Sequence, residues 1–204
     1  MKKTALLLAF FTGMAAAAQA SAQTTAKASV QGGYAGAGIM SVSTENARDF
    51  AAVNATSGDG SSTGFKVYGG YLWPSRFGIE VGYYDLGTYD VRTGTAKSDE
   101  FAVNALTVSG VYILPFARIF EFNAKVGLAF TNVDYTCVTG CGGIFVNTSK
   151  SGVGGLFGAG VGWRVAPNFG LRLDLEVIGV THSVGGVEAD YGYGALSFSG
   201  QVKF

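Results

Sequence analysis

The stretch FEFNAKVGLAF, residues 120–130, alternates residue by residue between apolar side chains and polar or small ones. Successive side chains of a β-strand point to opposite faces of a sheet, so strict alternation predicts a strand with two different faces. The same period recurs at 77–83, at 169–177 and from Tyr191 to the end of the chain. These four stretches predict an all-β fold.

Four further strands are less regular and are expected at 30–42, 63–73, 101–114 and 152–165. In the third of them the apolar positions change parity, which a β-bulge near Asn104 would explain. The three prolines, Pro74, Pro115 and Pro167, all fall in short connections, because proline cannot donate a hydrogen bond to a ladder. Longer polar connections are expected at 44–62, 90–98, 134–149 and 182–188.

Three short turns and four long loops join eight strands, an alternation typical of bacterial outer-membrane barrels. We therefore predict an eight-stranded antiparallel up-and-down transmembrane β-barrel. Alternation alone also fits a soluble barrel whose apolar face points inward. Glycine and alanine on the less apolar face favour lipid outside, because a narrow barrel has a crowded interior. The aromatic residues near the proline turns resemble an interfacial girdle: Trp73, Phe77, Phe116, Phe120, Trp163, Phe169 and Phe204.

The N-terminal segment is predicted to be an export signal. Lys2 and Lys3 precede a short apolar run, and the small-x-small sites Ala18-Gln19-Ala20 and Ala20-Ser21-Ala22 follow it. The run is too short for a membrane-spanning helix, and a core helix is the less favoured alternative. We predict a cleaved signal peptide at 1–22 and an outer-membrane barrel at 23–204, with the exact cleavage site left open between Ala20 and Ala22.

The composition supports export to a membrane. Charged residues make up 14% of the chain, against about 25% in soluble domains, while 32 of 204 residues are glycine and the mean hydropathy is +0.29. The 14 basic and 14 acidic residues leave no basic excess, so a nucleic-acid partner is not expected. No cofactor is expected, because no phosphate-cradling motif is present. No metal site is expected either, because metal binding by Cys137 and Cys141 would need more ligands and no histidine lies near them in the sequence.

The whole chain resembles the OmpA-type transmembrane barrels and their small OmpX-like and opacity-protein relatives. The residues that carry the resemblance are Tyr34-Ala35-Gly36-Ala37-Gly38, Glu80-Val81-Gly82-Tyr83-Tyr84-Asp85-Leu86-Gly87 and Val202-Lys203-Phe204. The resemblance implies a location in the bacterial outer membrane. It also implies that the terminal Phe204 belongs to the signal read by the barrel assembly machinery.

Nine charged residues fall on the predicted inward face: Lys66, Glu80, Glu121, Lys125, Arg164, Arg172, Asp174, Glu176 and Lys203. Unpaired charges in a narrow interior are costly, so these residues are expected to pair. The favoured interpretation is a salt-bridged plug that fills the lumen. The alternative is a gate whose pairs exchange partners and admit ions, since the resemblance links such interior pairs to gating.

Two other sets of residues invite a chemical interpretation. Cys137 and Cys141 lie in a long loop, and an exported protein favours a disulfide between them over metal binding. His182, Ser183 and Glu188 resemble the His/Ser/acid set of lipid-A-modifying barrels. Neighbours on a strand face opposite ways, and a nucleophile must reach its base, so catalysis is the less favoured hypothesis and no enzyme activity is predicted.

The predicted function is a structural and surface-interaction role, through adhesion, envelope integrity or host-factor binding by the extracellular loops. The expected partners are outer-membrane lipid, the barrel assembly machinery and host surface ligands; the oligomeric state is not predicted. A small low-conductance channel and a lipid-modifying outer-membrane enzyme are the alternatives.

Overall fold

The computed structural model describes residues 31–44, 57–58, 60–93, 96–137, 148–184 and 187–204. Within these residues the chain forms nine strands, and every pairing between them is antiparallel. The strands are β1 (Gly32–Thr44), β2 (Ser57–Gly58), β3 (Ser61–Leu72), β4 (Phe77–Thr93), β5 (Ala96–Pro115), β6 (Phe120–Cys137), β7 (Thr148–Ala166), β8 (Phe169–Val184) and β9 (Val187–Lys203). No helix among the described residues has the length and apolar character needed to cross a membrane.

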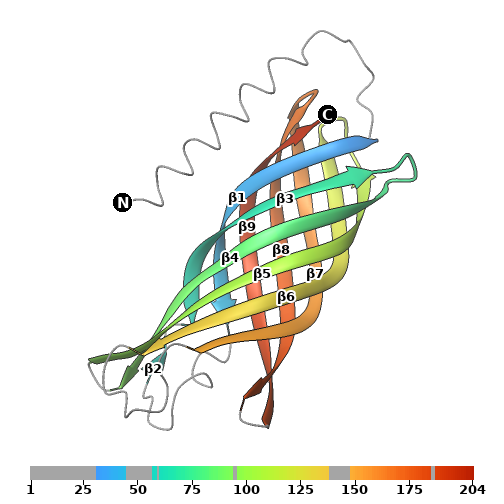
Figure 1. Ribbon diagram of the computed structural model, residues 1–204. Helices are drawn as coiled ribbons and strands as arrows, with labels where there is room; N and C mark the ends of the chain where they lie inside the picture. The colour runs from blue at the N-terminus through green and yellow to red at the C-terminus, as the bar shows by residue number, and fades with distance from the viewer. Residues whose placement is uncertain (1–30, 45–56, 59, 94–95, 138–147, 185–186) are drawn as a thin grey trace.

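Eight of the strands close into a barrel (Figure 1). From β3 to β9 each strand pairs with the next along the chain, and β1 pairs with both β3 and β9. The two-residue strand β2 adds to β4 beyond the barrel wall, with Ser57 opposite Arg92. Closure gives every barrel strand two partners, as a bilayer core requires. The predicted eight-stranded up-and-down barrel is confirmed.

The two ends of the barrel differ. One end, here called the turn end, holds the three proline-containing turns, the start of β1 and the end of β9 (Figure 1). The opposite end is called the loop end. The predictions of long loops at 90–98 and 182–188 are wrong. Only residues 94–95 separate β4 from β5, and only 185–186 separate β8 from β9. The strands instead continue through most of 90–98 and 182–188, which contain polar and charged residues. Such residues suit strands that project into water.

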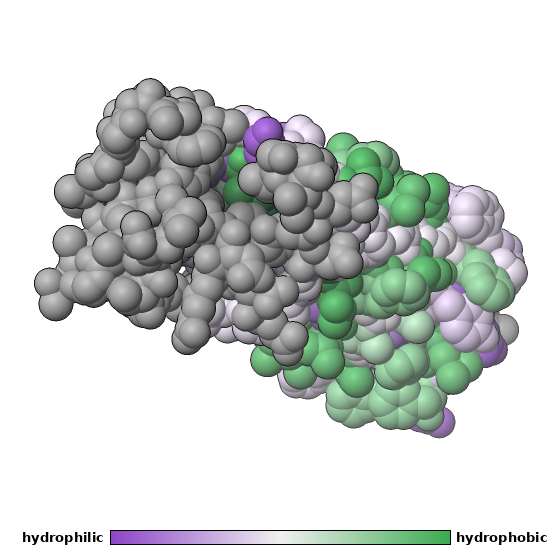
Figure 2. Space-filling view, turned by 90° about the horizontal axis from the view of Figure 1, so that it is seen from below, coloured by the Kyte–Doolittle hydropathy of each residue, from purple (hydrophilic) through white to green (hydrophobic). Residues whose placement is uncertain are grey.

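The strands turn their apolar side to the outside. On β8, Leu173, Leu175 and Val177 are at least half exposed, while the residues that alternate with them, Arg172, Asp174 and Glu176, are buried. Figure 2 shows the result, with apolar surface covering much of the described part of the barrel. Large apolar side chains are exposed on all eight barrel strands and together form an apolar band around the barrel. An apolar surface of this extent is unusual on a soluble protein and marks an interaction surface or a membrane surface.

The bulge expected near Asn104 lies in the neighbouring strand. Inward residues of β5 keep one parity from Val103 through Ile113, so β5 itself is regular there. Asp85 of β4 pairs with Asn104 and Gly87 pairs with Val103, which leaves Leu86 as the extra residue. Gly87 adopts a φ of 89°, a conformation that glycine tolerates best. The sequence suggested a bulge in β5 because inward positions of that strand also carry apolar residues.

Candidate functional site

Six of the nine predicted interior charges meet in the middle of the barrel. Alternation along β3, β4, β6 and β8 brings them to the inner face, where all six are buried: Lys66, Glu80, Lys125, Arg172, Asp174 and Glu176. Apart from β3 and β4, these four strands are not neighbours in the sheet. The charges therefore meet across the lumen and not along one wall.

The six side chains form a closed ring, here called the ionic ring, in which cations and carboxylates alternate. Lys66 Nζ lies 2.8 Å from Asp174 Oδ2 and 2.8 Å from Glu176 Oε2. Lys125 Nζ lies 2.7 Å from Glu176 Oε1 and 2.8 Å from Glu80 Oε1. Arg172 completes the ring, with Nη1 3.0 Å from Glu80 Oε2 and Nη2 3.3 Å from Asp174 Oδ1.

Every member of the ionic ring thus bridges two residues of opposite charge. Three cations and three carboxylates give the ring a formal charge of zero. Charges buried in a medium of low dielectric constant are tolerated only when they are paired and hydrogen-bonded, so this balance is what allows the ring to exist in a narrow barrel.

An aromatic side chain that the sequence interpretation missed lies beside the ring. The Tyr68 ring centroid is 5.4 Å from Lys66 Nζ, 6.0 Å from Lys125 Nζ and 5.0 Å from Arg172 Cζ. All three distances lie within the range of cation–π attraction. The sequence could have predicted this position, because Tyr68 follows Lys66 by two residues on β3 and residues two apart on a strand share a face.

Neutral polar side chains complete the hydrogen bonding of the ring. Tyr34 Oη donates to Glu80 at 3.0 Å, and Tyr84 Oη donates to Glu176 at 2.8 Å. Asn123 donates from Nδ2 to Asp174 at 3.1 Å and accepts from Arg172 at 3.3 Å, while Arg172 also donates to Gln201 at 3.2 Å. The carboxylates and the guanidinium are therefore held by more than their ionic partners.

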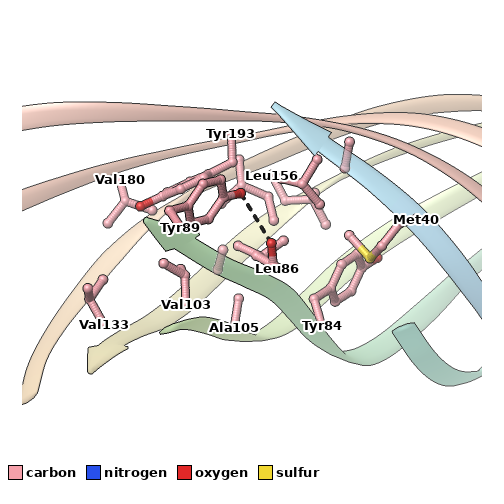
Figure 3. Close-up of a cluster of buried hydrophobic side chains, with 14 residues drawn as sticks. Met40, Tyr84, Leu86, Tyr89, Val103, Ala105, Val133, Leu156, Val180 and Tyr193 are labelled. Atoms are coloured by element: carbon pink, nitrogen blue, oxygen red, sulfur yellow. Dashed lines mark hydrogen bonds between the residues drawn. The ribbon is translucent and has the colours of Figure 1, made fainter. Parts of the chain in front are cut away.

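Apolar layers lie on both sides of the ionic ring. Toward the turn end, Tyr34, Tyr68, Leu72, Val111 and Ile113 form one buried cluster. Toward the loop end a larger cluster, here called the loop-end core, contains Met40, Val42, Tyr84, Leu86, Tyr89, Val103, Ala105, Ala129, Val133, Leu156, Ile178, Val180, Tyr193 and Ala195. Figure 3 shows this cluster, in which Tyr89 Oη donates to the Leu86 carbonyl at 3.1 Å.

These layers correct the expectation of an interior filled mainly by charge. The half of the interior nearest the loop end is apolar, which strict alternation of apolar outside and polar inside did not anticipate. Side chains such as Leu156 and Ile178 are fully buried there.

The other three predicted charges form a separate group at the turn end, here called the mouth cluster. Glu121 Oε2 lies 3.3 Å from Arg164 Nη2, and Glu121 Oε1 lies 3.0 Å from Lys203 Nζ. The two cations keep 25% and 21% of their side-chain surface exposed, whereas every ring member is almost completely buried. The predicted lumen network is therefore two groups with different access to water.

The remaining predicted residues are placed only in part. Phe204 is 78% exposed, and its main-chain N–H donates to the Gly33 carbonyl at 2.9 Å. Cys137 ends β6 and Cys141 lies outside the described residues, so the disulfide stays a prediction.

The backbone register sets Ser183 opposite Glu188 and His182 opposite Ala189. Since β8 continues to Val184, consecutive positions here still alternate between faces.

The fold and the interior match a known family. The profile of the OmpA-like transmembrane domain matches residues 28–190. The chain belongs to the OmpA-like transmembrane domain family. Its location is the bacterial outer membrane, and the exposed apolar band of this OmpA-like barrel is its lipid-facing surface. Outer-membrane barrels place their longer connections outside the cell. The two longest connections between barrel strands, 45–60 and 138–147, lie at the loop end, which assigns this end to the cell exterior and the turn end to the periplasm.

Solved structures with the same fold are small outer-membrane barrels. Neisserial surface protein A has 18% sequence identity to this chain and a TM-score of 0.60, over 84% of this chain and 97% of that one. OprG from Pseudomonas aeruginosa has 13% identity and a TM-score of 0.58, over 85% and 96%. Ail from Yersinia pestis has 15% identity and a TM-score of 0.52, over 85% and 99%. No curated protein sequence matches the chain.

Proposed function

We propose that this OmpA-like barrel is a surface-interaction protein, in which the barrel is a closed anchor and the loop end binds a partner outside the cell. The observation that carries the proposal is the filled interior. A neutral ionic ring lies between two apolar layers, and each of the residues that forms it is held by two ionic partners. This arrangement favours an anchor over an open pore.

The loop end offers the working surface. The hairpins β4–β5 and β8–β9 extend beyond the loop-end core, and the connections 45–56 and 138–147 join strands at the same end. Among the structures of similar fold, Ail is described as an attachment invasion locus protein, and it has also been solved with the heparin analogue sucrose octasulfate. An attachment role is the one that we carry over to this chain.

The charge of the loop end suggests which partner fits. Residues 45–60, 90–100, 134–150 and 182–191 contain nine acidic and four basic residues, a net charge of −5. Complementary charge steers association and disfavours wrong partners. We therefore propose a basic protein surface as the partner, and not a sulfated polysaccharide.

The test is adherence to cultured host cells by a non-adherent bacterium that displays the chain. A matched variant replaces Asp90, Glu100 and Asp134 with their amides, which removes charge at the loop end without changing side-chain size. We expect the wild type to adhere, the variant to adhere less, and soluble polylysine to compete better than heparin. Equal adherence with and without the chain would refute the surface-interaction role.

A low-conductance channel remains the second candidate, because charged side chains do line the interior. Planar-bilayer recordings distinguish the two functions. The filled interior predicts no discrete conductance steps for the wild type, and reproducible steps that change with Glu80→Gln would favour the channel. Lipid A mass spectra with and without His182→Ala test the enzyme alternative, and we expect them to be identical.

A further inference from the structure

The mouth cluster at the periplasmic end is unbalanced in charge. Two cations, Arg164 and Lys203, share the single carboxylate of Glu121, so the cluster has a formal charge of +1. The ionic ring deeper in the barrel is neutral. The cations of the mouth cluster are also partly exposed, so a ligand from outside can reach them.

A recess in the surface lies beside these cations. It is lined by Glu121, Arg164 and Lys203 together with the aromatic and proline side chains of Trp163, Pro167 and Phe169. Trp163 is 47% exposed on the lipid-facing side of β7. The recess is too small to enclose a phosphate group, so an anionic headgroup would lie across its opening and meet the exposed parts of both cations, while an attached apolar chain could continue along the aromatic side.

The recess lies at the level of an aromatic girdle. The stacked rings of Phe116, Phe120 and Trp163 lie on the outer wall at this end of the barrel, and Trp73 and Phe77 flank the neighbouring turn. Such girdles mark the boundary between hydrocarbon and water, where lipid headgroups are found.

Basic side chains outnumber acidic ones at the turn end. Arg76 and Arg118 are exposed in the turns, so the described residues of the turn end carry four basic side chains and one acidic one. We propose that the mouth cluster binds the phosphate of an anionic phospholipid headgroup in the periplasmic leaflet. The excess positive charge favours a ligand with net negative charge, whereas a zwitterionic headgroup supplies its own ammonium group.

The experiment measures unfolding of the full mature barrel by urea in phosphatidylcholine vesicles with and without phosphatidylglycerol. We expect phosphatidylglycerol to stabilise the wild type on the order of fivefold in the folding equilibrium constant for each cation engaged. Arg164→Gln and Lys203→Gln should each reduce this gain, and each leaves Glu121 with one cation. Glu121→Gln removes the internal competitor and should increase the gain.

Two further arms separate the sources of the effect. Lys150→Gln removes an exposed charge at the loop end and should keep the full phosphatidylglycerol gain. Inorganic phosphate added to phosphatidylcholine vesicles should not reproduce it. The proposal is overturned if Arg164→Gln and Lys203→Gln respond like the wild type, if Lys150→Gln loses the gain equally, if Glu121→Gln decreases it, or if free phosphate stabilises as well as the lipid does.

Discussion

Glu80 offers the sharpest test of the ionic ring. Its carboxylate accepts from Lys125 at 2.8 Å, from Arg172 at 3.0 Å and from the Tyr34 hydroxyl at 3.0 Å, and it is almost fully buried. Glu80→Ala would leave three cations against two carboxylates between the two apolar layers. It would also leave the Tyr34 hydroxyl without this partner.

The expected loss follows from these contacts. Removal of one member of a buried ion pair costs about 3–5 kcal/mol, because the opposite charge stays buried. Lys125 keeps Glu176 and Arg172 keeps Asp174, so the ionic part should fall near the lower limit. A buried hydroxyl that loses its partner adds roughly 1–3 kcal/mol. We therefore expect a total loss of about 4–6 kcal/mol in the free energy of unfolding.

The assay is reversible urea unfolding in lipid vesicles, followed by tryptophan fluorescence. Both tryptophans, Trp73 and Trp163, are about half exposed on the outer surface and so report contact with lipid. At slopes of about 2–3 kcal/mol/M, a loss of this size should lower the midpoint by roughly 1–3 M urea. Comparison of heated and unheated samples on a gel checks that the folded variant is still a closed barrel.

Two controls isolate the role of charge balance. Glu121→Ala removes a carboxylate from the mouth cluster and should cost less than Glu80→Ala, because the two cations that it leaves keep part of their surface in water. The double change Glu80→Gln with Lys125→Met restores neutrality, so its cost should be lower than the sum of the single changes by roughly 0.5–3 kcal/mol. An unchanged midpoint for Glu80→Ala, or strict additivity in the double variant, would refute the ring as a coupled unit.

Three further outcomes are expected. Leu173→Arg should cost about 2–4 kcal/mol near the bilayer midplane, while Val165→Arg near the turn end should cost about 0–1 kcal/mol; equal urea midpoints would contradict the lipid-facing assignment. Gly87→Ala should cost at least about 1–2 kcal/mol, because φ is 89° and the new Cβ would meet the Ser62 side chain, whereas Gly179→Ala enters open space and should be near neutral in the same assay. Mass spectrometry without reductant should find Cys137 and Cys141 joined, with a mass two hydrogens lower than after reduction; equal masses would exclude the disulfide.

The barrel was predictable because lipid and a narrow lumen impose opposite demands on alternate residues. In 120–130 and 169–177, every second side chain is apolar, so each strand and its two faces follow from one pattern. The prolines then locate the turns. The strand ends beyond the membrane were not predictable, because the residues at 90–98 and 182–188 no longer contact lipid and lose the alternation.

The interior was predictable as a set of residues but not as a set of partners. Arg172, Asp174 and Glu176 occupy alternate positions of one strand, so the sequence places them on one face. Lys66 lies 108 positions from Asp174, and only closure of the sheet with a particular stagger brings the two within 2.8 Å. Tyr68 was missed because aromatic side chains were expected on the lipid-facing surface. Its even spacing from Lys66 places it on the inner face, beside the cations.

The position of the ionic ring in the topology has a consequence for folding specificity. Its members come from β3, β4, β6 and β8, so the ring connects opposite walls and cannot form in an open sheet. A one-residue slip of β8 would turn Arg172, Asp174 and Glu176 toward lipid and bring Leu173 and Leu175 into the lumen. Each charge placed on the lipid face near the midplane would lower the free energy of unfolding by an amount on the order of kcal/mol. The remaining cations would also lose their partners. A neutral ring in a filled lumen therefore penalises wrong registers far more than an apolar core would, because an apolar side chain in the wrong place loses only its own packing.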